Sequence, residues 1–469
     1  MKIYNTLTRK KEILKPLGKT RDEKLRLFVC GPTVYDLSHI GHARTYIAFD
    51  AFVRYLRSEK HTVFYLQNIT DVDDKIIQRA AETNTNSRAL AKKFEQEYRR
   101  DMRYLGVMSV NEYARATDYI PEIINQVERL LRKRFAYEIS NDGIYYDISK
   151  FTDYGKLSKR KASSAEDAVS RIDESVQKRN KGDFALWKFS KPGEPKWESP
   201  WGSGRPGWHI EDTAITENHF GSQYDIHGGA RDLIFPHHEA EISQMEAISG
   251  REPLAKYWMH TGFLTVKGEK MSKSLGNFVT IRDFIKKYSP RILRFLVLKT
   301  SYRSPIDYSE ALILRTEREL ERIDEFTTKI QNPKSKIQIK SKFQISKYKT
   351  GFHKALEDDF NTPKAIAVLF NLVKQGNALL DKNTLSSKDA KAILAFLAEV
   401  DAIFGFIFWG KRSNHRVIPE AMQKLVKERE KHRKSGDWKK ADDLRKRLKQ
   451  KGWRLDDTPQ GPKLTIDRI

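Results

Sequence analysis

The sequence predicts an α/β fold built on a parallel β-sheet, and four successive features near the N-terminus carry this prediction. Residues 25–29 (LRLFV) alternate in the manner of a strand, and a turn at Gly31 and Pro32 follows them. From His42 onward, apolar residues recur at helical spacing, and residues 62–66 again favour a strand. Strand, turn, helix and strand in this order form a βαβ unit, whose two strands lie parallel.

The rest of the chain divides into segments of different character. Its 469 residues exceed what one hydrophobic core usually supports, so we expect three or four structural units. The expected elements are charged helices over 84–135, an irregular Pro- and Gly-rich insertion over 136–200, a strand at 224–226, a helix that begins at Pro236, a helix over 306–331 and a helical bundle over 351–409. The basic segment 333–349 is of low complexity, which indicates a linker or exposed loop.

The composition favours a soluble protein with a polyanionic partner. The formal net charge is +25, and the last 59 residues hold 19 Lys+Arg against 9 Asp+Glu. A merely solvated basic surface is the alternative. The N-terminus lacks an apolar run of signal-peptide length, and the apolar stretch 403–409 is too short to span a bilayer. The single cysteine, Cys30, excludes an intrachain disulfide, so we expect a reducing, cytoplasmic location and no membrane partner.

The tetrapeptide His-Ile-Gly-His at positions 39–42 stands at the predicted strand-to-helix turn. The start of a helix offers free backbone N–H groups and the positive end of the helix dipole to an anion. Gly41 lets a ligand approach the backbone closely. Because His39 and His42 are three residues apart, both imidazoles can face one ligand and donate hydrogen bonds to phosphate oxygens.

Far downstream, residues 270–274 read Lys-Met-Ser-Lys-Ser. Lys270 and Lys273 are flanked by hydroxyl groups, and Gly268 and Gly276 are possible hinges. The segment has the character of a mobile clamp for phosphate groups. Either motif alone is weak, because short strings of this kind occur by chance, but the two together in this order are a strong signal.

At these residues the sequence resembles the class I aminoacyl-tRNA synthetases, whose signature is the pair HIGH and KMSKS. The longer strings are similar to the cysteine-specific family: FVCGPTVYDLSHIGHARTYIAFD, NITDVDDKI, GRPGWHIED, DIHGGARDLIFPHHEAEI and DDFNTPKA. The resemblance extends from about residue 24 to the C-terminal string DDTPQGPK. It implies that the chain activates L-cysteine with ATP and transfers it to the 3′ end of tRNA(Cys).

The resemblance also implies a role for each matching residue. His39 and His42 would stabilise the α-phosphate of ATP, while Lys270 and Lys273 would hold the leaving pyrophosphate. The ATP subsite would contain Gly41, Gly228, Gly229, Asp232 and Lys273. The cysteine subsite would contain Gly31, Thr33, Thr70 and Trp208, although Trp208 is equally well a plain core residue. Mg²⁺ is implied by the ATP chemistry, without a dedicated ligand that the sequence identifies.

The family uses zinc, held by two cysteines, a histidine and a glutamate, to distinguish cysteine from serine. Cys30, His237 and Glu241 match three of these ligands, and Asp212 stands where the second cysteine is expected. Aspartate can also bind zinc, and it keeps the charge of the ligand set while making it harder. Alternatively, Asp212 accepts a hydrogen bond from His237 or His238, or the site stays empty. Without metal, Cys30 would be a small buried residue, and His237 and Glu241 an ordinary helix pair.

The C-terminal residues interleave Lys and Arg with Trp438 and Trp453, a pattern typical of RNA binding. Their position resembles the anticodon-binding domain of the family, with Arg445, Trp453 and Asp457 as candidate contacts. A solvated basic helix with two core tryptophans is the alternative.

The expected architecture is therefore a Rossmann-like parallel-sheet catalytic domain with an inserted connective segment, a helical bundle and a small anticodon-binding domain. The boundaries are 1–250 for the catalytic domain, with an insertion at about 115–200, 251–325 for the KMSKS-bearing stem-contact region, 326–410 for the bundle and 411–469 for the basic C-terminal domain. We expect a monomer. Three other functions stay open: a cysteine ligase with an amino-sugar acceptor of the mycothiol-pathway type, a catalytically silent RNA-binding paralogue, and another class I synthetase such as the methionine enzyme.

Overall fold

The computed structural model describes residues 1–18, 24–160, 177–271, 277–331, 343–409, 420–450, 453–458 and 461–466. The described chain divides into two compact units, Met1–Ile407 and Phe408–Ile469. Within the described residues, no helix is both long and apolar enough to cross a membrane.

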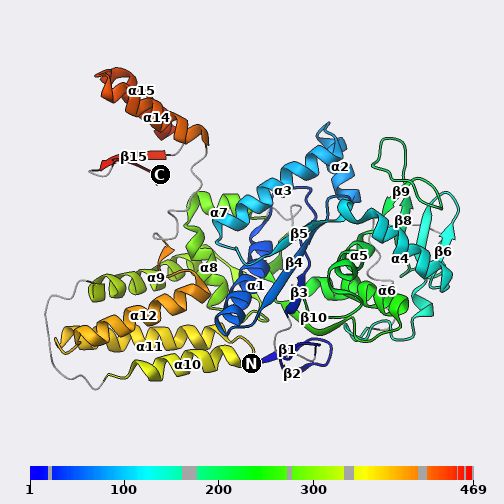
Figure 1. Ribbon diagram of the computed structural model, residues 1–469, viewed down its shortest axis with the longest axis horizontal. Helices are drawn as coiled ribbons and strands as arrows, with labels where there is room; N and C mark the ends of the chain where they lie inside the picture. Colours follow the sequence, from blue (N-terminus) through cyan, green and yellow to red (C-terminus); the bar gives the residue numbers. More distant parts are fainter. Residues whose placement is uncertain are drawn as a thin grey trace. The chain divides into compact units, whose positions relative to one another are not determined.

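The first unit is organised around a five-stranded parallel sheet (Figure 1). The strand order is β11-β10-β3-β4-β5. The bounds of these strands are β3 Leu25–Val29, β4 Val63–Ile69, β5 Glu112–Arg115, β10 Tyr224–Ala230 and β11 Ala255–Thr261. Neighbouring strands pair in parallel throughout. The predicted α/β fold with a parallel sheet is confirmed.

Helices cover both faces of this sheet (Figure 1). One face packs against α1 (Ile40–Ser58), the helix predicted from His42 onward, and α8 (Pro290–Leu298) packs on α1 in turn. The other face carries α4 (Ile120–Arg132), α5 (Trp208–Phe220) and α6 (Glu239–Ser249), which contact one another. Their apolar side chains join those of the strands in one core that includes Phe28, Leu66 and Trp258.

The strand order reverses between β3 and β10, because the chain moves from β3 outward to β4 and β5 and then returns to β10 on the other side. In open parallel sheets, ligands bind beyond the carboxyl ends of the strands at such a reversal. Cys30 directly follows β3 at this point, and Thr70 directly follows β4. The fold therefore places both residues at the expected binding edge.

The insertion is more regular than the sequence indicated. Residues 136–206 contain a four-stranded antiparallel sheet, in the order β6-β7-β8-β9. Its strands are β6 Ala136–Ile139, β7 Gly143–Tyr146, β8 Phe184–Phe189 and β9 Gly204–Pro206. The prediction of irregular structure was wrong because these strands are short and β7 is buried at all four positions, so it shows no alternation.

The segment 84–135 contains a strand as well as helices. It holds α3 (Ser87–Tyr104), β5, a short 3₁₀ turn and α4. The prediction that this segment is helical was wrong at β5, which forms because β4 offers it a partner edge. The helix predicted at Pro236 is confirmed, because Phe235 before the proline is extended and a short π-helical stretch ending at His238 leads directly into α6 at Glu239.

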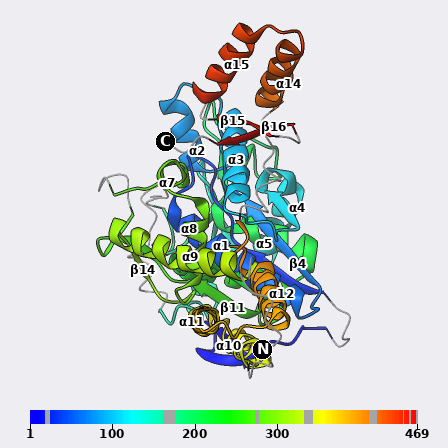
Figure 2. The same ribbon diagram turned by 90° about the vertical axis from the view of Figure 1, so that its left-hand side faces the viewer.

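A helical group follows the parallel sheet. It consists of α9 (Glu310–Gln331), α10 (Ile345–Glu357), α11 (Thr362–Asp381) and α12 (Ser387–Phe404), which lie side by side in Figures 1 and 2. The bundle predicted over 351–409 is confirmed. The loop predicted over 333–349 is wrong from Ile345 onward, where α10 begins, and residues 332–342 lie outside the described residues.

The second unit has two helices and a two-stranded antiparallel hairpin. Its elements are α14 (Glu420–Lys434), α15 (Trp438–Gln450), β15 (Trp453–Thr458) and β16 (Gly461–Ile466). Met422, Leu448 and Leu455 form its small core, against which Trp453 packs.

Candidate active site

His39 and His42 lie together at the start of α1. His39 is the N-cap residue, and its Nδ1 accepts a hydrogen bond from the backbone N–H of Gly41 at 3.0 Å. The backbone N–H of His39 donates to Nδ1 of His42 at 3.4 Å, and the two rings stack with centroids 3.9 Å apart. Since both Nδ1 atoms accept, a neutral imidazole in either residue carries its proton on Nε2.

Burial lowers the pKa of His42 to about 4, so its imidazole is neutral at physiological pH. A neutral imidazole with an Nε2–H group is a hydrogen-bond donor without a full charge. Gly41 completes the turn, because a Cβ atom there would lie 2.7 Å from the His39 ring and 3.2 Å from Cε of Met271. The absence of a side chain at Gly41 thus brings the His39 turn and the KMSKS segment into contact.

The segment that follows KMSKS is hydrogen-bonded to this same turn, and the segment before KMSKS forms a hairpin. On the near side, β12 (Leu264–Val266) and β13 (Glu269–Lys270) form a hairpin whose tip residues, Lys267 and Gly268, have positive φ angles of 55° and 77°. On the far side, the backbone N–H of Ile40 donates to the carbonyl of Val279 at 3.1 Å. The side chain of Lys270 and residues 272–276, with Lys273 and Gly276, lie outside the described residues.

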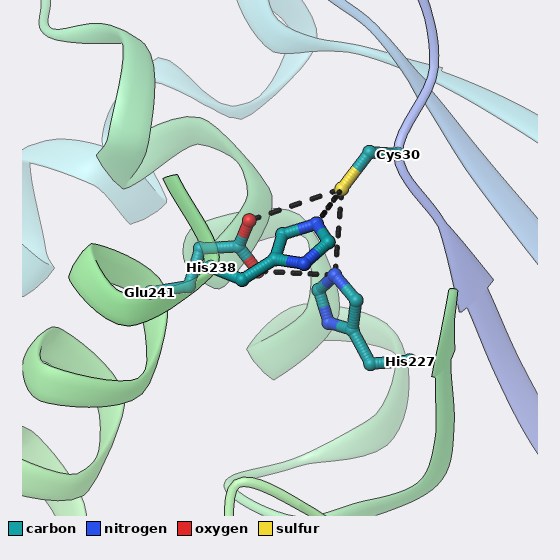
Figure 3. A group of neighbouring side chains, drawn as sticks. All are labelled: Cys30, His227, His238 and Glu241. Carbon is teal, nitrogen blue, oxygen red and sulfur yellow. Dashed lines mark hydrogen bonds and ion pairs between the residues drawn. The ribbon is translucent and has the colours of Figure 1, made fainter. Parts of the chain in front are cut away.

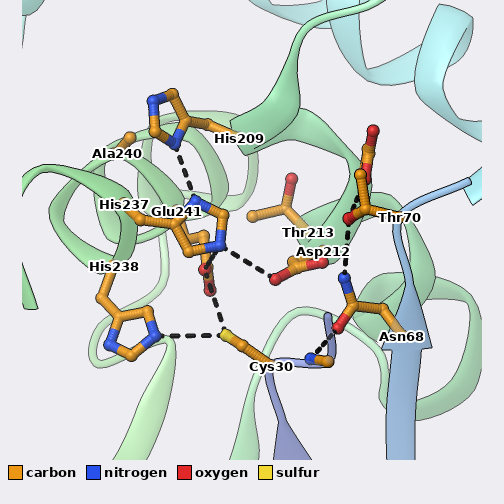
Figure 4. A network of polar contacts seen from close by, with 12 residues as sticks. Cys30, Asn68, Thr70, His209, Asp212, Thr213, His237, His238, Ala240 and Glu241 are labelled. Atoms are coloured by element: carbon orange, nitrogen blue, oxygen red, sulfur yellow. Dashed lines mark hydrogen bonds and ion pairs between the residues drawn. The ribbon is translucent and has the colours of Figure 1, made fainter. Parts of the chain in front are cut away.

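Cys30, Asp212, His237 and Glu241 meet in one buried group (Figure 4). Their ligand atoms all lie within 4.8 Å of one another, and each residue is at most 4 % exposed. Nε2 of His237 is 3.1 Å from Oδ2 of Asp212 and 3.0 Å from Oε1 of Glu241. The other oxygen of Asp212, Oδ1, is buried without a hydrogen-bond partner. The four residues predicted as metal ligands are therefore brought together.

A second group of four shares two of these residues (Figure 3). Sγ of Cys30 lies 3.1 Å from Nε2 of His238 and 3.4 Å from Nε2 of His227, and Oε2 of Glu241 is 3.4 Å from the latter atom. Nδ1 of His227 is held by the hydroxyl of Tyr224 at 2.6 Å. Because Cys30 and Glu241 belong to both groups, the two groups are alternative sites for a single metal ion.

Burial and neighbouring carboxylates control protonation in this region. Burial, followed by Glu241 and Asp212, raises the pKa of the Cys30 thiol well above its usual range. Burial opposes the charged form of His237, but Glu241 and Asp212 outweigh it and raise that pKa to about 9. Burial lowers the pKa of His227 and of His238 well below the usual range. In this cluster His237, between the two carboxyl groups, is therefore the charged imidazole, whereas His227 and His238, beside the Cys30 thiol, are neutral.

A chain of hydrogen bonds joins the Cys30 turn to α5 (Figure 4). The backbone N–H of Gly31 donates to Oδ1 of Asn68 at 2.5 Å, and Nδ2 of Asn68 donates to Oγ1 of Thr70 at 3.4 Å. The hydroxyl of Thr70 donates to Oε2 of Glu211 at 2.7 Å. Burial, followed by Asp212, raises the pKa of Glu211 well above its usual range.

The remaining candidate cysteine contacts surround this chain. Thr33 pairs with Thr70 through an isolated parallel bridge. Trp208 begins α5 and is 36 % exposed, with its ring stacked on that of His237 at a centroid distance of 4.2 Å. It is therefore a partly exposed residue at the metal-capable group, which favours a binding role over a plain core role.

The residues predicted for the ATP ribose lie at the carboxyl end of β10, where Asp232 is exposed. A Cβ atom at Gly228 would lie 2.4 Å from the Phe49 ring, and one at Gly229 would lie 2.8 Å from the His238 ring. The absence of side chains at both glycines is therefore required for the Phe49 and His238 rings to pack against β10, whether or not a nucleotide binds there.

In the second unit, Arg445 is exposed on α15, whereas Trp453 packs on the core. The carboxylate of Asp457 is bound by Arg429 at 2.5 and 2.8 Å and by Arg433 at 2.8 Å. Trp438 is 60 % exposed, and the guanidinium of Arg433 lies 5.9 Å from its ring centroid. Exposure thus favours Trp438 over Trp453 for stacking on a base.

Sequence reasoning missed several residues of the buried group. His209, whose Nδ1 lies 2.8 Å from Nδ1 of His237, stands next to the candidate Trp208. His260 on β11 holds Nδ1 of His238 at 2.8 Å, and His227 lies on β10. The string GWHIED near the predicted ligands could have indicated His209, whereas His238 was expected only as a possible hydrogen-bond donor to Asp212. No local signal marks His260, because only the pairing of β10 with β11 brings it to the site.

Three family models match the chain. A model of the class I (C) tRNA synthetase catalytic domain matches residues 16–318, a DALR domain model matches 351–408, and a cysteinyl-tRNA ligase anticodon-binding domain model matches 415–457. The first alone covers more than half of the chain, and the third is specific to one amino acid.

Curated relatives match the chain over nearly its whole length. The cysteine–tRNA ligase of Thermococcus gammatolerans is 46 % identical over 98 % of both chains, and that of Carboxydothermus hydrogenoformans is 43 % identical over 98 % of this chain and 99 % of the relative. Among solved structures, methionyl-tRNA synthetase of Mycobacterium tuberculosis with methionyl-adenylate has a TM-score of 0.59 at 16 % identity, covering 82 % of this chain and 88 % of that one. This likeness shows a shared fold. The chain belongs to the cysteine–tRNA ligase family of class I aminoacyl-tRNA synthetases.

Proposed function

We propose that the chain activates L-cysteine with ATP to cysteinyl-adenylate and transfers the cysteinyl group to the 3′ end of tRNA(Cys). The observation that carries this proposal is the position of Met271 against Gly41, which joins the two phosphate-handling motifs at the sheet edge beside Cys30. Full-length similarity to cysteine–tRNA ligases supports the choice of amino acid and acceptor.

In this proposal the α-phosphate of ATP lies at the N-terminus of α1. The Nε2–H groups of His39 and His42 donate to its oxygens as negative charge develops during attack by the cysteine carboxylate. Lys270 and Lys273 hold the pyrophosphate as it leaves, and Mg²⁺, when bound, would neutralise part of its charge. The ATP contacts are completed by Gly41, Gly228, Gly229 and Asp232. The protein itself forms no covalent bond, so positioning and electrostatics supply the acceleration.

The donor set suits the zinc ion that the family implies. Cys30, Asp212, His237 and Glu241 provide one sulfur, one nitrogen and two oxygen donors in a buried group, and Oδ1 of Asp212 has no other partner. These residues would hold Zn²⁺, which supplies a soft Lewis acid that prefers the thiolate of cysteine to the hydroxyl of serine. Trp208 covers the amino acid, while Gly31, Thr33 and Thr70 line its other side.

The tRNA contacts are assigned to both units. We propose catalytic residues 1–250 with the insertion at about 115–200, a stem-contact region at 251–325, a bundle at 326–410 and an anticodon-binding domain at 411–469. Arg445 and Asp457 are proposed anticodon contacts, Asp457 acting together with the arginines that bind it, and Trp453 is proposed to support this surface from the core. The protein is proposed to act as a monomer.

Pyrophosphate exchange with ATP tests the first half of the reaction. Cysteine should support exchange, whereas serine and methionine should not, and the purified protein should contain about one equivalent of zinc. Exchange with cysteine but without bound zinc would retain the enzyme and exclude the metal site. If cysteine gives no exchange, a silent RNA-binding protein becomes the better account.

Charging of an acceptor tests the second half. Radiolabelled cysteine should become attached to a tRNA(Cys) transcript and not to an amino-sugar acceptor. Removal of residues 411–469 should weaken charging far more than exchange, because the basic unit acts on the tRNA alone. Charging that survives this truncation unchanged would exclude an anticodon-binding role.

A further inference from the structure

The first turn of α5 presents three side chains on one face. Trp208, Glu211 and Asp212 occupy positions i, i+3 and i+4, which are neighbours on a helix surface. Trp208 is 36 % exposed, whereas Glu211 and Asp212 are 0 % and 1 % exposed. This face therefore carries an indole at the surface and two carboxyl groups in the interior. Asp212 belongs to the metal-capable group, and Glu211 has no role in the functions considered above.

Only one of the two oxygen atoms of the Glu211 carboxyl group has a hydrogen-bond partner. Its Oε2 accepts from Thr70 at 2.7 Å, but its Oε1 is buried and has no hydrogen-bond partner. Within the described residues Glu211 forms no ion pair, and the charged neighbours that act on it most are the carboxylates of Asp212, Asp73 and Asp71. Burying a carboxyl group without a cation or a second hydrogen-bond donor costs folding free energy. A ligand that supplies such a donor would offset this cost.

The side chains around Glu211 have already used their N–H and O–H donors in hydrogen bonds to one another, but some of their oxygen atoms can still accept a hydrogen bond. The amide of Asn68 receives from Gly31 and donates to Thr70, and the Thr70 hydroxyl proton is committed to Glu211. A lone pair of Thr70 Oγ1 and the whole of Glu211 Oε1 remain as acceptors. A positively charged group with several N–H donors, such as a primary ammonium, complements this arrangement.

We infer that Glu211 binds the ammonium group of the amino-acid substrate, directly through Oε1 and indirectly by orienting the Thr70 hydroxyl. The inference rests on the proposed function, which places cysteine between Thr70, Trp208 and the metal-capable group. The nitrogen and sulfur of cysteine are separated by two carbon atoms, and the two carboxyl groups that would serve them are consecutive on α5. Asp212 thus serves the sulfur end, and Glu211 serves the nitrogen end.

This assignment predicts that Glu211 strengthens the binding of compounds that carry an ammonium group. Two cysteine analogues, tested as inhibitors of the full-length protein, measure this selectivity. Cysteamine has the thiol and the ammonium but no carboxylate, and 3-mercaptopropionate has the thiol and the carboxylate but no ammonium. Glu211→Gln keeps the size of the side chain and removes its charge. The variant should raise the KM for cysteine and the inhibition constant of cysteamine by about 10- to 100-fold. The inhibition constant of 3-mercaptopropionate and the KM for ATP should change less than about twofold.

Two further variants separate binding from general loss of structure. Glu211→Asp retains the charge and should restore part of the cysteine affinity. Glu95→Gln removes another buried carboxylate, which is bound by Arg99 at 2.8 Å and Arg115 at 2.7 Å away from the substrate, and should leave the KM for cysteine unchanged. Thermal unfolding of each variant verifies that the fold is intact.

The outcomes are distinct. Selective weakening of the two ammonium-bearing compounds supports the inference. Equal weakening of all three thiols, or an unchanged KM for cysteine in folded Glu211→Gln, overturns it while leaving the proposed function intact. A wild-type protein that neither exchanges pyrophosphate nor binds cysteine overturns both.

Discussion

Asp212 Oδ2 lies 3.1 Å from Nε2 of His237, at the position where the resemblance to the family implies a second cysteine. If Asp212 is a metal ligand, Asp212→Ala should lower zinc affinity by more than about 100-fold, because loss of a mere hydrogen-bonding partner already costs about 10- to 100-fold. Asp212→Cys should bind zinc more tightly than the wild type, since a second thiolate softens the site. Competition with a chromophoric chelator measures both.

The alternative metal-capable group, which contains His227 and His238 in place of Asp212 and His237, provides the control for this prediction. His227→Gln removes a ligand only of the group that contains His238, so it should retain about one equivalent of zinc. Retention of zinc by Asp212→Ala together with its loss from His227→Gln would assign the ion to Cys30, His227, His238 and Glu241 instead.

His42→Ala should reduce cysteine-dependent pyrophosphate exchange by about 10²- to 10³-fold, the usual cost of one donor to a developing negative charge. Affinity for tRNA should stay nearly intact, because His42 belongs to the proposed ATP site and not to the proposed tRNA contacts. His61→Ala, an exposed histidine beyond the end of α1, is the matched control and should leave exchange unchanged. Equal loss of exchange and of tRNA affinity in His42→Ala would contradict the role given to this residue.

Trp438→Ala should raise the KM for tRNA(Cys) by about tenfold, since stacking on one base contributes about 1–3 kcal/mol. Its ring is 60 % exposed on the basic second unit, so its removal should not disturb the core. Ile13→Ala, at a residue 55 % exposed on β2 (Lys10–Ile13) and outside the proposed tRNA-contacting regions, is the control. An unchanged KM for tRNA would exclude base stacking by Trp438.

The sequence was informative where function depends on local pattern. The strand before Cys30, the helix after His42 and the spacing of His237 and Glu241 each follow from residues close together in the chain. The insertion sheet and β5 were missed because their strands are defined by distant partners, β7 by β8 and β5 by β4. The same reason hid His260 and His227, which approach Cys30 only through the pairing of β10 with β11 and β3.

Arg294→Met should destabilise the first unit by about 3–5 kcal/mol, because it leaves a buried carboxylate without its main cation. Arg294 and Asp50 are both 0 % exposed, and Nη2 of Arg294 lies 2.5 Å from Oδ2 of Asp50. The exposed pair of Arg315 and Glu319 is the control, and Arg315→Met should change stability by less than about 1 kcal/mol. Denaturation in urea measures both, and similar midpoints for the two variants would contradict the prediction.

Acid should destabilise the first unit through its buried histidines. Burial, assisted by Arg9 and Arg231, lowers the pKa of His260 to about 3, against about 6.5 in the unfolded chain. A histidine with a lowered pKa contributes stability that is fully present above about pH 6.5 and is lost as the pH falls toward about 3. Between about pH 5 and 6 the unfolded chain binds almost one more proton at this residue, so the free energy of unfolding falls by about 1 kcal/mol per pH unit on its account.

His260→Asn removes this titrating group and should make the dependence of unfolding free energy on pH shallower by that amount. Thr6→Val is the matched control, because it removes the hydroxyl that lies 2.8 Å from Nδ1 of His260 but leaves the imidazole in place. Both variants lose the same hydrogen bond, and only the first should change the slope. Equal slopes in wild type and His260→Asn would show that His260 titrates alike in the folded and unfolded chain.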